Sequence, residues 1–141
     1  MKVTSYAVAR PAYYDRNSTS TFGLYNDLIA PAGLTTRVTS TVAAGKKLQI
    51  EALGCTITTQ TVSAPAGRNI ALVAISNGVS SADLVRIDAT NTNVAGSFRQ
   101  DVKSLVLTLF AGETVFGQTL DFSTGGTQYF GLFFKGSTFD A

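Results

Sequence analysis

The sequence contains no histidine, and its only cysteine is Cys55. The absence of histidine excludes the Ser–His–Asp and Cys–His arrangements of nucleophilic catalysis, together with every His-ligated zinc site. A single cysteine excludes an intramolecular disulfide framework. Carboxylates are present, but their spacing singles out no pair for acid–base catalysis. We therefore predict that the protein is not an enzyme and has no cofactor or metal ligands.

Charged residues are scarce. They make up 14% of the chain, against about 25% in an average soluble protein. The net charge is +2, and the longest basic cluster is Lys46–Lys47, which is too short to neutralise several phosphates together. We expect no nucleic-acid partner. The polar surface must come from 12 serines and 19 threonines, which suits a protein whose faces are covered by partners.

Long apolar runs are missing as well. No run approaches the ~18 residues of a transmembrane helix, and the first residues lack the continuous apolar region of a signal peptide. We therefore expect a soluble protein made in a cytoplasm, with no membrane partner. The segment "DATNTN", residues 88–93, gathers oxygen ligands in the manner of a calcium loop. We favour an Asx-rich turn between strands for this segment.

What the sequence does contain is the alternation typical of β-strands. Leu48 and Ile50 share one face of "KLQIEAL", and Leu105, Leu107 and Leu109 share one face of "SLVLTLF". We therefore predict that residues 1–141 form one all-β domain, a single antiparallel β-sandwich of about 8–10 strands with an extended N-terminal arm. The predicted strands are 3–9, 34–41, 47–53, 55–61, 69–76, 84–88, 104–110, 115–121 and 127–135.

Alanine–glycine pairs precede several of these strands, at Ala44–Gly45, Ala66–Gly67 and Ala111–Gly112. Glycine reaches positive φ without a Cβ clash, so each pair predicts a turn that leads into a strand. The spacing is irregular, which argues against a repeat architecture. Residues 80–89 also fit the start of a short helix, but the alternation of the segment leads us to assign a strand.

Residues 10–27, "RPAYYDRNSTSTFGLYND", carry aromatic side chains without alternation. We predict an irregular, aromatic-rich arm or loop. Tyrosine and arginine frequently anchor interfaces, so the arm either contacts a partner or folds over the sandwich and buries its own rings. Its predicted partner-contact residues are Arg10, Tyr13, Tyr14, Arg16, Phe22 and Tyr25.

The segment "TQYFGLFFKG" is apolar on both faces. Tyr129 and Phe133 lie on one face, and Phe130, Leu132 and Phe134 lie on the other. Only one face of a strand meets the core of a two-layer sandwich, so the second face needs another cover. We predict that Phe130 and Phe134 contribute to a partner contact.

The phrases "AGKKLQIEALG" and "TGGTQYFGLFFKG", the extended N-terminal segment and the scarcity of charge resemble the small all-β proteins that decorate or cement the capsids of tailed bacteriophages. The resemblance extends over the whole chain and is one of pattern. It implies a jelly-roll domain that forms a homotrimer, binds the major capsid protein and lies on the exterior of the virion after synthesis in the host cytoplasm.

We therefore expect a structural virion protein, a capsid decoration protein that oligomerises and stabilises the shell. The same order of turns and strands is similar to that of receptor-binding fibre tips and carbohydrate-binding modules. A carbohydrate- or receptor-binding β-sandwich domain is thus the alternative, and it would use the same tyrosine-rich arm.

Overall fold

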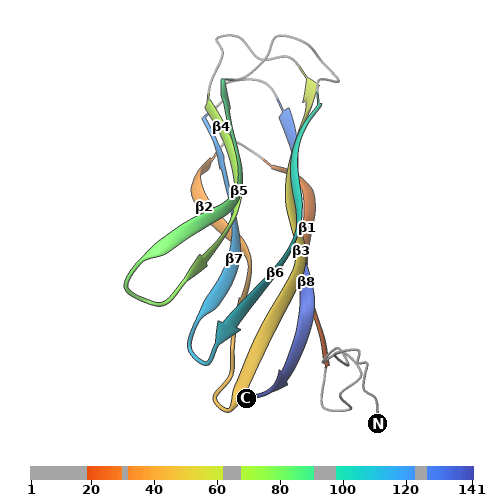
Figure 1. Ribbon diagram of the computed structural model, residues 1–141. Helices are drawn as coiled ribbons and strands as arrows, with labels where there is room; N and C mark the ends of the chain where they lie inside the picture. The colour runs from red at the N-terminus through yellow and green to blue at the C-terminus, as the bar shows by residue number, and fades with distance from the viewer. Residues whose placement is uncertain (1–18, 30–31, 62–67, 91–97, 123–126) are drawn as a thin grey trace.

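The computed structural model describes residues 19–29, 32–61, 68–90, 98–122 and 127–141. These residues form eight antiparallel strands and no helix. Sheet A has the strand order β1-β8-β3-β6, and sheet B has the order β2-β7-β4-β5. The sheets face each other across a shared core (Figure 1), which confirms the predicted all-β sandwich. The strands are β1 Thr19–Ile29, β2 Ala32–Thr41, β3 Lys46–Thr61, β4 Arg68–Ser76, β5 Ser81–Thr90, β6 Phe98–Phe110, β7 Thr114–Asp121 and β8 Thr127–Asp140.

The strand pairing is nested. β1 pairs with β8, β2 with β7, β3 with β6 and β4 with β5. The chain thus runs out and back as one long hairpin with the β4–β5 turn at its tip, and successive pairs belong alternately to sheet A and sheet B. Pairing of β3 with β8 and of β4 with β7 joins the pairs within each sheet. Consequently β1 and β6 are the edges of sheet A, and β2 and β5 are the edges of sheet B.

Strand β3 shows how alternation produces the core. Leu48 and Ile50 point between the sheets, as predicted, and each is at most 2% exposed. The register of β3 shifts between Ile50 and Ala52 against both neighbours. This β-bulge lets Leu53 follow Ile50 into the core and keeps the later alternation in phase. The two strands predicted at 47–53 and 55–61 are therefore one continuous strand.

Strand β1 corrects the prediction for residues 10–27. Residues 19–27 are not irregular but form most of β1, which pairs with β8 along its whole length. The alternation is hard to see in the sequence because Gly23 occupies a buried inward position, where the Phe134 ring fills the space of the missing side chain. The large residues Phe22 and Leu24 point outward instead. Residues 10–18, like the strand predicted at 3–9, lie outside the described residues.

Two of the predicted alanine–glycine turns are confirmed. Gly45 and Gly112 have φ angles of 75° and 87°, in the region that favours glycine. The turns are also linked, because Val42 accepts a hydrogen bond from the Gly112 N–H and donates one to the Glu113 carbonyl, both at 2.9 Å. The third pair, Ala66–Gly67, lies outside the described residues.

Polar side chains are buried where β3 ends and β4 begins. Thr59 Oγ1 donates to Gln128 Oε1 across β3 and β8, at 3.0 Å. The side-chain amide of Asn69, with its nitrogen oriented toward β7, donates a hydrogen bond to Asp121 Oδ1 at 2.9 Å. All four residues are at most 2% exposed. Such hydrogen bonds are what burial of polar groups requires, and here they close one end of the core.

Candidate functional site

The outer face of sheet A carries most of the large exposed apolar side chains in the described residues. On β6, Leu105, Leu107 and Leu109 pack against the core, as predicted, and the even-numbered residues point outward. On β1 the buried Gly23 and the half-buried Tyr25 leave the even-numbered residues outside in the same way. The resulting side chains, each more than half exposed, are Phe22, Leu24, Phe98, Val102, Val106 and Phe110.

Four residues in register form an apolar row across the whole of this face. Leu24 of β1 is opposite Phe133 of β8, Phe133 is opposite Gly54 of β3, and Gly54 is opposite Val102 of β6. A Cβ at Gly54 would stand 2.6 Å from Phe133 Cε1 and 2.9 Å from Val102 Cγ2. The two side chains therefore converge over the glycine. We call Leu24, Phe133, Gly54 and Val102 the apolar row.

A hollow of about 180 Å³ adjoins the apolar row over Gly131. Gly131 has no side chain to fill the space, and a Cβ added at this position would collide with Thr56 Oγ1. The hollow is bounded by the apolar Leu24 and Phe133 and by the polar Asn26 and Thr56. It combines an apolar wall with an amide and a hydroxyl group.

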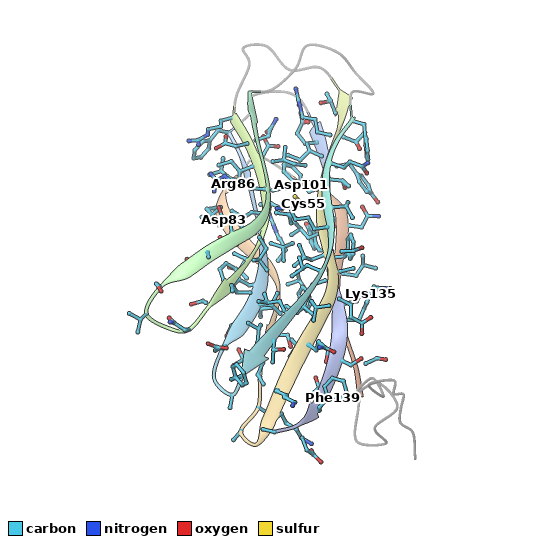
Figure 2. All side chains as sticks on the ribbon, in the orientation of Figure 1. Cys55, Asp83, Arg86, Asp101, Lys135 and Phe139 are labelled. Atoms are coloured by element: carbon cyan, nitrogen blue, oxygen red, sulfur yellow. The ribbon has the colours of Figure 1, made fainter. Side chains whose placement is uncertain are left out.

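On the outer face of sheet B, the edge strand β5 is charged. Arg86 donates to Asp83 at 2.8 Å and to Asp88 at 3.1 Å, and Arg68 donates to Asp88 at 2.7 Å. Asp83 and Arg86 are seen on β5 in Figure 2. Hydrogen bonds from Arg68 and then Arg86 hold the pKa of the Asp88 carboxyl well below its usual range. We call these four residues the β5 ion-pair ladder.

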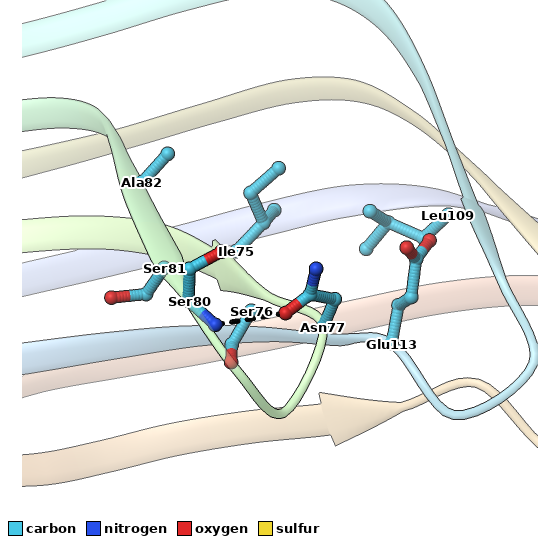
Figure 3. A pocket seen from close by; sticks show the side chains of 8 residues that line it. All are labelled: Ile75, Ser76, Asn77, Ser80, Ser81, Ala82, Leu109 and Glu113. Atoms are coloured by element: carbon cyan, nitrogen blue, oxygen red, sulfur yellow. Dashed lines mark hydrogen bonds between the residues drawn. The ribbon is translucent and has the colours of Figure 1, made fainter.

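A second hollow, of about 170 Å³, lies between the β4–β5 and β6–β7 turns (Figure 3). The polar side chains Asn77 and Glu113, which line it, accept hydrogen bonds from backbone groups of the two turns. Asn77 Oδ1 accepts the N–H groups of Val79 and Ser80, both at 2.9 Å. Glu113 Oε1 accepts the Phe110 N–H at 2.8 Å. The hollow is therefore a by-product of turn closure, and its carboxylate is already engaged.

The residues predicted to contact a partner are separated by the structure. Phe22 is 63% exposed on the outer face of sheet A. Tyr25 points inward, where the Arg37 guanidinium lies 5.4 Å from its ring centroid. Phe130 and Phe134 are at most 1% exposed in the core between the sheets, so the prediction that they contact a partner is wrong. Outside the described residues lie Arg10, Tyr13, Tyr14 and Arg16.

Phe130 and Phe134 were assigned to the wrong face for a simple reason. The sequence shows that β8 is apolar on both faces, but it does not show which face meets sheet B. The register places Phe130 and Phe134 beside the buried Ile57 and Leu53, so Phe133 is the outward phenylalanine. The sequence pattern does not indicate Val102 either, because this residue lies in a charge-rich stretch of β6 that precedes the predicted strand 104–110.

Residues that could bind a metal ion are not brought together in the described part of the chain. No group of three or more Cys, Asp and Glu side chains is placed to hold a metal ion there. Asp88, the first residue of the oxygen-rich segment 88–93, lies in β5 and is ion-paired with two arginines, while residues 91–93 lie outside the described residues. Burial, and then the charge of Asp101, raise the pKa of the Cys55 thiol to about 12, which disfavours the reactive thiolate.

Comparison with known proteins assigns no family. No family model matches this sequence, and no curated protein sequence matches it. Among the described residues, no helix has the length and apolar character needed to cross a membrane. The observation that bears on function is the set of exposed apolar side chains on the outer face of sheet A.

Proposed function

We propose that this chain is a structural virion protein, a decoration or cement protein that oligomerises and stabilises a capsid from its exterior. The observation that carries the proposal is the apolar row, with Phe22, Phe98, Val106 and Phe110 around it on the same face. An exposed apolar row that crosses four strands is a surface feature typical of interaction sites. The role requires no catalysis, cofactor, nucleic acid or membrane.

The nested strand pairing supports a finer fold assignment within this proposal. Four pairs formed by one long hairpin, wound so that successive pairs alternate between two sheets, are the arrangement of an eight-stranded jelly roll. Viral capsid proteins are among the proteins that use this architecture, and lectins are others. We propose that the sandwich belongs to the jelly-roll class.

In the proposed mechanism the sandwich is a rigid clamp. The outer face of sheet A is built on paired strands, so little backbone conformational entropy is lost when it docks. Burial of its apolar side chains contributes about 25 cal/mol per Å² before the costs of association. Several copies joined in an oligomer bind the shell simultaneously, which raises the overall affinity without any new contact. The resemblance alone implies a trimer.

The test compares two valine-to-serine variants. Val102→Ser alters the apolar row, and Val79→Ser alters an even more exposed valine, 94% against 51%, in the turn between β4 and β5. Binding is measured by co-sedimentation with shells of the major capsid protein encoded in the same genome. We expect Val102→Ser to bind about tenfold more weakly, corresponding to ~1.4 kcal/mol, and Val79→Ser to bind like the wild type. Wild-type protein that fails to sediment with the shells would overturn the proposal.

A carbohydrate-binding role is the second candidate, favoured by the hollow over Gly131. Its Phe133 ring offers an apolar surface for a sugar face, and Asn26 and Thr56 offer hydrogen-bonding groups. A glycan array with the wild type and Thr56→Val separates the two roles. Valine keeps the shape of threonine and removes its hydroxyl, so a sugar bound in the hollow would be lost in the variant. A sugar bound equally by both proteins would rule out the hollow as its site.

A further inference from the structure

The four edge strands of the sandwich are β1 and β6 in sheet A and β2 and β5 in sheet B. An edge strand presents a row of backbone N–H and C=O groups that another chain can pair with. Proteins block such pairing with bulges, charged side chains, inward-pointing charges or covering groups. Among the residues that the structure describes, three of these four edges show such features, and β1 does not.

The β5 and β6 edges protect each other. Asp101 of β6 accepts the backbone N–H of Arg86 at 2.9 Å, and Lys103 of β6 donates to the Leu84 carbonyl at 2.9 Å. Two backbone groups on the outer edge of β5 are thus occupied by side chains from the facing sheet, and Asp101 and Arg86 lie near each other in Figure 2. The pairing of β5 with β4 also shifts register, between Val73 and Ala74 of β4. These charges and hydrogen bonds disfavour the addition of a strand at either edge.

The β2 edge is irregular. Its pairing with β7 shifts twice, between Ala32 and Thr35 and between Thr36 and Val38. Arg37, within the second shift, turns its side chain toward the core and donates from Nε to the buried Thr119 hydroxyl at 3.0 Å. Bulges and an inward-pointing charge are both features that prevent regular pairing at an edge.

The β1 edge is regular and nearly uncharged. Its 11 residues pair with β8 in one uninterrupted register. The strand contains no lysine, arginine or proline, and its one charged residue is Asp27. Phe22 and Leu24, each 63% exposed, stand on its outer face. Within the part of the chain that the structure describes, no strand pairs with the second edge of β1.

We infer that β1 pairs antiparallel with β1 of a second copy of this chain, about a two-fold axis at Gly23. The strand is self-complementary in this register. Phe22 of each copy is opposite Leu24 of the other, and such apolar cross-strand pairs stabilise sheets. Asp27 is opposite Thr19, so no like charges meet. A two-fold axis uses the same surface on both copies and closes the assembly at two chains.

The paired strands join the two copies of sheet A into one eight-stranded sheet. The apolar row of each copy then meets that of the other at the axis, because Leu24 lies at the β1 end of the row and is followed by Phe133 on β8. The result is one apolar face that is twice as wide. This inference deepens the self-association in the proposed function, but it does not depend on a capsid.

Light scattering on the full chain tests the assembly. We expect a mass twice that of the 14.8-kDa chain at micromolar concentration. Phe22→Lys places a charge opposite Leu24 of the other copy and is expected to give monomers with unchanged circular dichroism. Val102→Lys, on the same face but on the far edge strand, is expected to stay dimeric. A wild-type trimer or monomer would overturn the inference. Monomers of both variants would overturn it as well, because they would indicate association through the outer face of sheet A and not through the β1 edge.

Disulfide trapping tests the register without relying on a destabilising change. Phe22→Cys and Leu24→Cys chains are mixed and oxidised, with Cys55 buried and so a poor competitor. We expect a covalent dimer that contains one chain of each kind, and much less when Phe22→Cys is mixed with Asn26→Cys. Equal trapping in both mixtures would overturn the register. Neither experiment contains capsid shells. A negative result in either one would therefore count against the β1 pairing alone, and the proposed binding to a capsid would still be decided by its own test.

Discussion

Phe133 lies over Gly54 on the outer face of sheet A. The two residues are directly opposite in β8 and β3, and a Cβ at Gly54 would stand 2.6 Å from Phe133 Cε1. The glycine is therefore required by packing, because its missing side chain is the space in which the ring lies. The same arrangement brings Phe133 close to Val102 of β6 and makes the apolar row continuous.

We predict that Gly54→Ala destabilises the protein by about 1–3 kcal/mol, because the added methyl group forces the Phe133 and Val102 side chains to move. Urea unfolding measures the change. Gly33→Ala is the matched control, since a Cβ there meets no atom within 4 Å, and it is expected to be neutral or to stabilise by up to ~1 kcal/mol. Equal losses in the two variants would contradict the packing role of Gly54.

A larger effect is predicted for Gly136→Ala. A Cβ at this position would collide with the carbonyl oxygen of Gln49 and would stand 2.9 Å from the Ile50 Cα. Backbone atoms cannot rotate away as the Phe133 ring can, so the strands beside the β3 bulge would have to separate. We expect a loss of about 3 kcal/mol or more in the free energy of unfolding. A loss smaller than that of Gly54→Ala would show that the bulge yields easily.

The sequence predicted the strands with clear alternation, and it failed where large residues point outward. Leu48, Ile50 and Leu109 are buried as their spacing indicates. In β1 the inward position is occupied by Gly23, so the alternation of size is reversed and the strand resembles an irregular segment. In β8 both faces are apolar, and only the register with β3 shows that Phe133 points outward. The pairing of distant strands is a property of the whole fold and is not visible in a short segment.

The Cys55 thiol is predicted to be unreactive in the folded protein. It is fully buried, its Sγ donates to the Ala71 carbonyl at 3.4 Å, and its pKa is raised to about 12. A disulfide reagent at pH 8 should react only after urea unfolds the chain. Because the folded pKa lies above the unfolded one, the unfolded state releases its proton first as pH rises above ~8.5. This group therefore stabilises the fold below that pH, and its contribution decreases toward pH 12. Rapid labelling without denaturant would contradict its burial.

The β5 ion-pair ladder is predicted to give a small pH-dependent stabilisation. Hydrogen bonds from Arg68 and Arg86 lower the pKa of Asp88 in the folded state, so the carboxylate favours folding above its unfolded pKa of ~3.9 and loses this effect as pH falls further. Asp88→Asn should therefore lower the Tm slightly at pH 7 and have little effect at strongly acidic pH. The pairs are exposed and screened by salt, so 1 M NaCl at pH 7 should also bring the two melting curves together. A difference that persists in acid and in salt would instead come from the shape of the side chain, and the ladder would then contribute no charge effect.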